Sequence, residues 1–192
     1  MRIVFCGVGA LGSSAATLCR ILDATFAFVD FDKVESKNVL AQAFVKQSIG
    51  KNKAEALKLQ FQNFYGLKAE AFGVRLAAEN ADTLCGTGDL LVDCFDNAAS
   101  RAMLSAFARK ANKPLVHAAI SGDGAFGLVR WDERFVPDQE DAAGQATCEG
   151  GEHLPVIGQI AATLAGVIRD FARNGARRDA MVTIASVTPT FG

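Results

Sequence analysis

Residues 7–12, GVGALG, carry three glycines in the spacing GxGxxG directly after the short apolar run 3–6. The stretch 11–22 follows with apolar and small residues at helical spacing, so a strand, a tight turn and a helix are predicted in that order. This context gives the glycines physical roles. Gly7 permits the turn, Gly9 lets backbone come close to a phosphate, and Gly12 lets helix and strand pack. Because a helix N-terminus offers free N–H groups to an anion, a nucleotide is the predicted ligand.

The alternation of short apolar runs with amphipathic stretches continues along the chain. It predicts strands over 3–6, 25–29, 67–74, 89–96, 114–120 and 126–131, and helices over 11–22, 51–64, 77–84, 97–111 and 156–171. Between them, 33–50 is predicted as a loop or short turn and 137–151 as a mobile loop. Strands that alternate with helices predict an α/β fold, a doubly wound, Rossmann-like, mainly parallel sheet with helices on both faces. A chain of 192 residues is expected to form a single nucleotide-binding domain over 1–192.

Charge and cysteine usage exclude several classes of protein. Twenty Lys and Arg against 21 Asp and Glu give a net charge of −1, so we expect no nucleic-acid partner and no membrane partner. Five cysteines without a CxxC pair predict neither a disulfide framework nor a structural zinc. The N-terminus lacks a secretory signal pattern, and the apolar stretch 154–168 is shorter than the ~20 residues that span a bilayer. We therefore expect a soluble protein of the reducing cytoplasm.

An acidic residue ends the second predicted strand. Asp30 follows the glycine turn by about 20 positions, where an acidic side chain hydrogen-bonds a ribose in dinucleotide-binding folds. These two features alone favour an NAD-dependent oxidoreductase, but no convincing acid or base for hydride transfer follows in the sequence. Two purely structural interpretations remain open. The glycine turn can lack a ligand, and Asp30 and Asp32 can be ordinary residues that end a strand.

Further motifs occur in order along the chain. They are residues 30–34 with 36–42, then Ile49, Gly50 and Lys53, then 93–97 with Arg101, then 114–120, and finally Thr147 and Cys148 before 154–158. In this order they resemble the DxDxVxxSNLxRQ, GxxK, DCxDNxxxR, PLVxxA and TCxxxGxxxPxxG stretches of the ThiF/MoeB family, the ubiquitin-activating-enzyme-like adenylyltransferases. The resemblance extends from residue 2 to about residue 172. Several motifs in order are more specific than any one of them.

The resemblance implies cofactors and a partner. Members of the family use ATP and Mg²⁺ to adenylate the C-terminal carboxylate of a small ubiquitin-like or sulfur-carrier protein. They commonly pair through the nucleotide domain, so a homodimer or heterodimer is expected. A carboxylate that attacks an α-phosphate approaches an already negative centre, so the site needs cations and a metal.

The resemblance also assigns roles to single residues. Asp96 is the expected Mg²⁺ ligand, because Mg²⁺ takes carboxylate oxygen together with phosphates and water, and Asp93 or Asp30 is expected to support it. Lys53 is the expected cation for the phosphates, with Lys51 as its substitute. The implied nucleotide-binding residues are Gly7, Gly9, Gly12, Asp30, Asp32, Asn38, Gln42, Lys53 and Asp96, and the implied catalytic residues are Lys53, Asp96 and Cys148.

Some of these residues have structural interpretations as well. Asn97 can cap the following helix while Asp96 binds a metal. Cys148, in a polar loop, is a candidate nucleophile that captures the acyl adenylate as a thioester. The other four cysteines are expected to be small buried hydrophobic residues, and His117 a satisfied structural histidine.

Two cations of the family pattern are expected to be missing. Ala41 occupies the arginine position of SNLxRQ, and the sequence begins at the first strand, without the preceding segment whose arginine crosses the family's dimer. Loss of a phosphate-facing arginine costs roughly 10³ to 10⁵ in rate in other phosphoryl-transfer sites. The main alternative is therefore a noncatalytic subunit that keeps the fold while a partner supplies arginine and thiol. Arg20, Arg75 and Arg101 are candidate substitutes.

Overall fold

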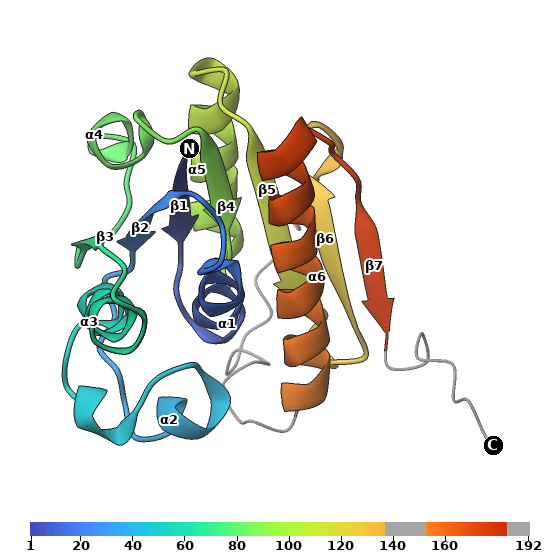
Figure 1. The fold of residues 1–192 in the computed structure, drawn as a ribbon. Coiled ribbons are helices and arrows are strands. Elements are labelled where there is room, and N and C mark those ends of the chain that lie inside the picture. Colours follow the sequence, from blue (N-terminus) through green and yellow to red (C-terminus); the bar gives the residue numbers. More distant parts are fainter. Residues whose placement is uncertain (137–152, 184–192) are drawn as a thin grey trace.

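The fold of this chain is given by a computed structural model that describes residues 1–136 and 153–183. Within these ranges one sheet holds strands in the order β3-β2-β1-β4-β5-β6-β7 (Figure 1). The strands are β1 (Arg2–Cys6), β2 (Thr25–Val29), β3 (Ala69–Phe72), β4 (Leu90–Asp93), β5 (Leu115–Ile120), β6 (Phe126–Trp131) and β7 (Ala180–Thr183). The α-helices are α1 (Ala10–Cys19), α2 (Asn38–Ala41), α3 (Lys53–Tyr65), α4 (Ala81–Cys85), α5 (Ala98–Lys110) and α6 (Leu154–Asn174), and the 3₁₀ turns are η1 (Lys46–Ser48) and η2 (Asp132–Arg134).

Strands β1 to β5 run parallel, and β6 runs antiparallel to both of its neighbours, β5 and β7. β1 lies between β2 and β4, and Cys6 is paired with Val29 on one side and with Asp93 on the other. From β1 the chain moves outward to β2 and β3 and then returns to β4 on the opposite side of β1. In such open sheets, ligands bind outside the carboxyl ends of the strands at this reversal. The fold therefore directs attention to the ends of β1, β2 and β4.

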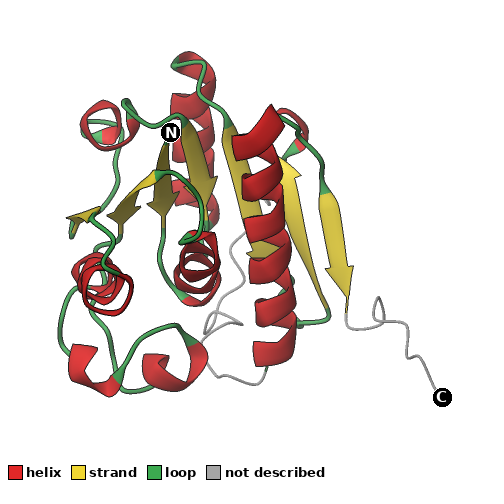
Figure 2. Cartoon of the chain, in the orientation of Figure 1, coloured by secondary structure: helices red, strands yellow, loops and turns green. Residues whose placement is uncertain are grey.

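Helices cover both faces of the sheet, as the sequence predicts (Figure 2). Alternate residues of β1 enter different cores, because successive side chains in a strand point to opposite faces. Ile3 and Phe5 pack with α1, α3 and α6, whereas Val4 and Cys6 pack with α4 and α5. The predicted doubly wound α/β fold is confirmed.

The helix α6 is the longest apolar element. The helix has 21 residues, and an 18-residue window within it has a mean hydropathy of 1.3, which would allow a membrane span by length and composition. Length therefore does not exclude a span, contrary to what the stretch 154–168 led us to expect. Ile157, Ile160 and Leu164 are nevertheless fully buried in the core on the α1 side of the sheet. The buried positions form one stripe along α6, which is the pattern of a helix that packs on a sheet. Burial in the core explains the apolar composition of α6.

Most predicted elements are confirmed with shifted boundaries, and two regions differ. The strand β7 was not predicted, and the expected loop 33–50 contains α2 and η1. Four residues at a sheet edge carry too little periodicity to be distinguished from a loop, and β7 forms only because β6 pairs with it. The predicted mobile loop 137–151, with Cys148, lies outside the described residues.

Candidate functional site

The glycine turn has the geometry that its spacing predicts. Gly7 has a φ of +83°, and a Cβ there would lie 2.9 Å from the carbonyl oxygen of Cys94. A Cβ at Gly12 would lie only 2.0 Å from the carbonyl oxygen of Gly7, whereas a Cβ at Gly9 would meet nothing within 4 Å. Gly7 and Gly12 are thus needed for the turn and for close packing. Gly9 faces open space, where a ligand can approach the backbone.

The start of α1 is arranged to receive an anion. Gly9 is the N-cap of α1, and the helix has neither a side-chain cap nor an acidic residue in its first turn. The first N–H groups of a helix have no intrahelical acceptor, and its dipole favours negative charge there. Gly7 N donates to Val29 O (2.9 Å), so the turn is tied to the end of β2. A phosphate is the group that suits this position.

Asp30 holds the glycine turn from the end of β2. Its carboxylate accepts hydrogen bonds from Val8 N (2.8 Å) and Asp32 N (2.9 Å). Burial raises the pKa of Asp30, although the charge of Lys53 and these two N–H groups oppose the rise. Each carboxylate oxygen has a second lone pair, so the contact of Asp30 with a ribose stays a prediction.

Lys53 is brought into the same cluster by the start of α3. Its Nζ lies 3.2 Å from Asp32 Oδ2, and its side chain is 11% exposed while that of Asp32 is 48% exposed. Asn52 fixes this arrangement, since its Oδ1 accepts from Glu55 N and its Nδ2 donates to the carbonyl oxygens of Asp30 (2.8 Å) and Asp32 (3.1 Å). The cation is therefore held close to the carboxyl end of β2.

Lys51, the expected substitute for Lys53, is exposed. Its backbone belongs to the turn before α3, where Val34 N donates to Lys51 O (2.8 Å). The structure thus distinguishes the two lysines. Lys53 is nearly buried against Asp32, whereas Lys51 extends into solvent.

The segment after α2 lies against the start of α1. Ser13 Oγ donates to Gly9 O (2.6 Å) and accepts from Ala43 N (3.1 Å). This contact brings the neighbouring Gln42 close to the glycine turn, and Gln42 Oε1 is buried without a hydrogen-bond partner in the described part of the chain. A buried polar group without a partner costs about 1–3 kcal/mol. Gln42 therefore offers an acceptor that a bound ligand can satisfy.

Two residues of α2, Asn38 and Ala41, are buried. Asn38 Oδ1 accepts from Glu35 N (2.8 Å), which closes the turn that begins α2. Its contact with a ligand stays a prediction. Ala41 is buried as well, so the position of the motif arginine carries no cation.

Asp96 lies on the turn after β4, which touches the glycine turn. Cys94 N donates to Cys6 O (2.9 Å), and a Cβ at Gly7 would lie 3.1 Å from Phe95 N. Asn97 Oδ1 caps α5 by accepting from Ser100 N (2.9 Å), as predicted. Asp96 itself is exposed, and its Oδ1 accepts a long hydrogen bond from Asn97 Nδ2 at 3.4 Å. Its carboxylate is therefore accessible, one residue from the backbone that contacts the glycine turn.

This arrangement fits Mg²⁺ better than a metal held by protein ligands alone. Among the described residues, no three His, Cys, Asp or Glu side chains are grouped so that they could hold a metal. Mg²⁺ is usually bound through one or two carboxylates together with substrate phosphates and water. Asp96 next to a phosphate at the glycine turn would meet that requirement.

Two of the three candidate substitutes for the missing arginine are unsuited to phosphate contact. Arg20 follows the last residue of α1, at the opposite end from the glycine turn, and its Cζ lies 4.9 Å from the ring centroid of Tyr65. Arg101 points inward, donating through Nη2 to Phe95 O and to Ala118 O (3.2 Å). Neither guanidinium faces the start of α1.

Arg75 is the candidate at the correct end of the sheet. It follows β3, which runs parallel to β2, and its Cζ lies 3.9 Å from the ring centroid of Phe31. Phe31 stands between Asp30 and Asp32, so this guanidinium borders the same loop as the cluster around Lys53. Arg75 is therefore the favoured substitute.

His117 is buried between two carboxylates on the face of the sheet opposite α1. Its Nδ1 lies 2.6 Å from Asp93 Oδ2 and its Nε2 lies 3.0 Å from Asp132 Oδ1. Burial by itself lowers the pKa of His117, but the hydrogen bonds to Asp132 and Asp93 outweigh it and the pKa is raised. Burial likewise acts to raise the pKa of Asp132, yet hydrogen bonds from His117, Arg109 and Ser105 lower it to about 2. The expectation of a satisfied structural histidine is confirmed.

Sequence reasoning missed Asp132. It directly follows β6, whose antiparallel pairing sets Arg130 opposite His117. A polar residue after a predicted strand was the available signal, but the register that brings it to His117 is not readable from local sequence.

Three of the four described cysteines are buried, in line with the prediction of small buried hydrophobic residues, although the hydrogen bond with Cys6 lowers the pKa of Cys85. Cys6, Cys19 and Cys85 are buried and Cys94 is half-buried. Burial raises the pKa of Cys19 to about 12 and that of Cys94 further. A thiol with so high a pKa is a poor nucleophile. The role of Cys148 stays a prediction.

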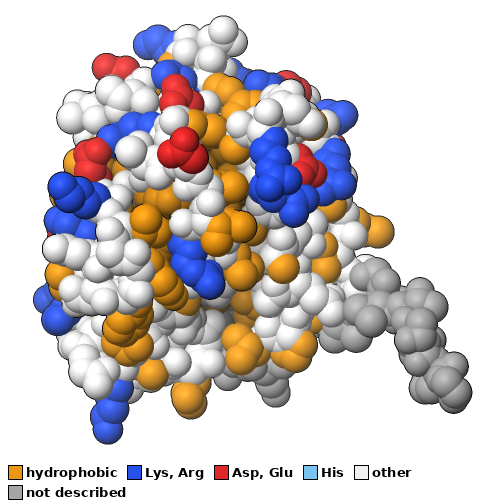
Figure 3. Space-filling model, viewed as in Figure 1, with side chains coloured by type: hydrophobic (Ala, Val, Ile, Leu, Met, Phe, Trp, Pro, Cys, Tyr) orange, Lys and Arg blue, Asp and Glu red, His pale blue; other side chains and the backbone are white. Residues whose placement is uncertain are grey.

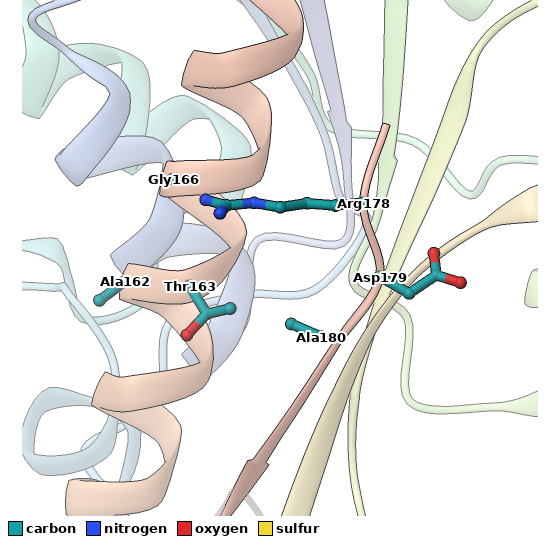
Figure 4. Close-up of a pocket in the computed structure, with 6 residues that line it drawn as sticks. All are labelled: Ala162, Thr163, Gly166, Arg178, Asp179 and Ala180. Carbon is teal, nitrogen blue, oxygen red and sulfur yellow. The ribbon is translucent and has the colours of Figure 1, made fainter. Parts of the chain in front are cut away.

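A shallow pocket lies apart from these strand ends, between α6 and the segment leading into β7 (Figure 4). Its volume is about 470 Å³, and it is lined by Ala162, Thr163, Gly166, Arg178, Asp179 and Ala180. Arg178 is paired with Asp170 at 2.7 Å. Around the end of α6 the surface mixes basic with acidic side chains, rather than being uniformly basic (Figure 3).

Comparison with known proteins gives a family and a fold. Residues 1–168 match the ThiF family. A Caenorhabditis briggsae protein named adenylyltransferase and sulfurtransferase MOCS3 is 27% identical over 170 residues, covering 82% of this chain and 42% of that protein. A Thermus thermophilus sulfur carrier protein adenylyltransferase is 35% identical over 94 residues, covering 48% of this chain and 35% of that protein. The chain thus spans less than half the length of these curated relatives.

A solved structure extends the comparison over nearly the whole chain. The crystal structure of E. coli MccB with ATP has a TM-score of 0.79 and 15% identity, covering 97% of this chain and 61% of that one. At this identity the likeness concerns the fold. It places the seven-stranded, mainly parallel sheet among known architectures.

Proposed function

The chain belongs to the ThiF family, and on this premise we propose that it is an adenylyltransferase. It joins the AMP part of ATP to the C-terminal carboxylate of a ubiquitin-like or sulfur-carrier protein, and pyrophosphate leaves. The relatives named above support the reaction class, because both names contain adenylyltransferase and one specifies a sulfur carrier protein. We also propose that the protein is cytoplasmic and that it forms a homodimer or heterodimer.

One observation carries the proposal, namely that two turns from different parts of the chain touch at the switch point. The glycine turn after β1 contacts the backbone of the turn after β4, which bears Asp96. The nearly buried Lys53 stands at the end of the neighbouring strand β2. Backbone donors, a cation and an accessible carboxylate at one strand edge suit a nucleoside triphosphate.

The chain's own residues have distinct tasks in this reaction. The N–H groups at the start of α1 bind a phosphate, and Gly9 leaves room for its approach. Lys53 offsets negative charge on the phosphates and is kept in position by Asp32. Asp96 would hold Mg²⁺, which when bound lowers the charge that the attacking carboxylate meets.

The charge balance of this site calls for a further cation. Asp30, Asp32 and Asp96 bring three carboxylates to the strand ends, against Lys53 alone among the predicted phosphate ligands. Ala41 leaves the motif arginine unreplaced in α2. Arg75 after β3 is the described residue that we propose for this task.

Exchange of labelled pyrophosphate into ATP in the presence of candidate carrier proteins tests the proposal. We expect exchange that depends on the carrier C-terminus and on Mg²⁺. Replacing Lys53 by Met should lower the exchange rate by roughly 10² to 10³, as the loss of a preorganised charge does in other sites. Lys51→Met is the matched control, because Lys51 is exposed two positions away, and its rate should stay within about twofold.

The noncatalytic alternative retains one supporting observation, the missing cation at the buried Ala41. A noncatalytic subunit would bind ATP without exchange, whatever carrier protein is supplied. Exchange that appears only after a second ThiF-family subunit is added would favour this alternative. No ATP binding under any of these conditions would refute both functions.

A further inference from the structure

A chain of hydrogen bonds, buried except at the exposed Arg109, leads from α5 to the turn that carries Asp96. On α5, Arg109 Nε donates to Asp132 Oδ2 (2.6 Å) and Ser105 Oγ donates to Asp132 Oδ1 (2.5 Å). From Asp132 the chain passes through the ring of His117 to Asp93, at 3.0 Å and 2.6 Å. Asp93 is the last residue of β4, so the chain ends where the turn begins.

The turn is held at the residue directly before Asp96. Phe95 N donates to Asp93 Oδ1 (2.9 Å), and Phe95 O accepts from Arg101 Nη2. Both backbone polar groups of Phe95 are therefore engaged, one by Asp93 and one by Arg101. Since the carbonyl of Phe95 belongs to the peptide bond of Asp96, these two bonds set where the Asp96 side chain starts.

His117 is the link that fixes Asp93. Asp93 is fully buried, and a buried carboxylate needs a charged or hydrogen-bonding partner. Arg101 Nη1 is 3.7 Å from Asp93 Oδ2, too long for a hydrogen bond, whereas His117 Nδ1 is at 2.6 Å. A Phe135 ring stacked on His117, with centroids 3.8 Å apart, keeps the imidazole in this plane.

The setting of the ring favours its imidazolium form. Both of its nitrogens face carboxylate oxygens, and only the doubly protonated ring can donate on both sides. The charged groups around it are Asp93 from β4, Asp132 after β6, and Arg101 from α5, with Arg109 behind Asp132. Two carboxylates around one imidazolium form a rigid bridge across three segments of the chain.

We propose that His117 is a positioning residue of the nucleotide site, which holds Asp96 in place for a metal by bridging Asp132 to Asp93. The inference rests on the proposed function, because the position of Asp96 matters only if nucleotide and metal bind there. It goes further by assigning a task to a residue on the face of the sheet opposite α1. Residues hydrogen-bonded directly to a metal ligand typically change metal affinity by 10- to 100-fold, and His117 acts through Asp93 and Phe95, so an effect at the lower end of this range is expected.

The test is ATP binding by calorimetry, once with excess Mg²⁺ and once with EDTA. The ratio of the two affinities isolates the contribution of the metal. We expect His117→Gln to lower this ratio by about tenfold and to leave binding in EDTA within about twofold of the unmodified chain. A residue that only stabilises the fold would change neither affinity in the folded protein.

Val116→Ala supplies the matched control. Val116 precedes His117 in β5 and is fully buried in the core on the opposite face. Its truncation should lower the Tm through a core cavity without changing the affinity ratio. An equal fall of the ratio in both variants would overturn the inference, because general loosening would then explain the result.

The remaining outcomes separate this inference from the proposed function. An unchanged ratio in His117→Gln overturns the inference and leaves the function standing. Equal affinities with Mg²⁺ and with EDTA in the unmodified chain overturn the metal role of Asp96, and the inference with it. Should His117→Gln not fold, Asp132→Asn removes the charge behind the ring while keeping an acceptor, and an unchanged ratio there is equally decisive against the inference.

Discussion

Two clusters of charged side chains lie at strand ends of this sheet. They differ in how many of their polar groups have close partners within the cluster. Around His117, two carboxylates, an imidazole, a hydroxyl and a guanidinium are joined at 2.5 to 3.0 Å, and His117 is 1% exposed. Around Lys53, the pairing with Asp32 is 3.2 Å long and Asp32 is about half exposed. The first cluster is closed and the second is open.

The difference indicates which cluster meets a ligand. Polar groups buried away from water are costly unless paired, so a closed cluster has nothing left to offer. The open cluster retains an unpartnered oxygen on Gln42, an accessible carboxylate on Asp96 and the start of α1. Changes in the open cluster should therefore alter binding and chemistry, while changes in the closed cluster should alter stability first.

The largest expected effect is in the open cluster. Asp96→Ala should lower Mg²⁺-dependent pyrophosphate exchange by roughly 10³, because a charged group that acts on the reacting phosphates is lost. The Tm should stay within about 2 °C, since Asp96 is exposed. Glu79→Ala, which removes another exposed carboxylate, controls for the change in net charge. A large fall in Tm for Asp96→Ala would contradict the assignment of this residue to the open cluster.

The glycine turn allows the same contrast within one motif. Gly12→Ala should destabilise the fold by about 3 kcal/mol, because its Cβ would lie 2.0 Å from Gly7 O and backbone must move. Gly9→Ala should leave stability within about 0.5 kcal/mol, since its Cβ meets open space, but should weaken ATP binding. Urea unfolding and ATP titration measure the two quantities. Equal destabilisation by both variants would show that the glycines share one structural role.

Sequence reasoning reached the open cluster because its signals are local. The spacing from Gly7 to Gly12 predicts a tight turn and close packing, and both occur. The strand over 25–29 has the predicted bounds. Apolar periodicity and a glycine spacing are properties of neighbouring residues, so they survive without knowledge of the tertiary structure.

The closed cluster could not be predicted in the same way. Asp132 reaches His117 only through the antiparallel register of β5 and β6, and Ser105 joins them from a separate helix. Similarly, the carboxylate of Asp30 binds the N–H of Val8 across 22 positions. Such contacts depend on strand pairing at long range, which the residues around each partner do not encode.

The pH dependence of stability tests the charges of the closed cluster. The pKa of Asp132 is lowered from 3.8 to about 2, so its stabilising effect is present above pH 4 and is lost as the pH falls toward 2. The pKa of His117 is raised above 6.5, so its effect is present below that pH and is lost as the pH rises through the raised value. The contribution of Asp132 is on the order of 2 kcal/mol.

Thermal unfolding across pH, measured for the unmodified chain and for His117→Gln, tests this dependence. The difference in stability between the two should be largest between pH 4 and 6.5 and should shrink on both sides. A difference that stays constant as the pH rises from 6.5 through the raised pKa of His117 would mean that His117 is not charged in the folded protein.

The smallest expected effect concerns two arginines that both stack on an aromatic ring, although Arg20 also donates to Thr17 O (2.6 Å). Arg75 stacks on Phe31 beside the open cluster, and Arg20 stacks on Tyr65 at the far end of α1. Exposed stacking of this kind contributes about 0.5–1 kcal/mol, so both alanine variants should lose similar stability. Arg75→Ala should also raise the KM for ATP about fivefold, since a cation near phosphate or base adds roughly 1 kcal/mol of binding, whereas Arg20→Ala should leave the KM unchanged. If the two variants give the same KM, Arg75, in the turn after β3, is not the cation that replaces the motif arginine.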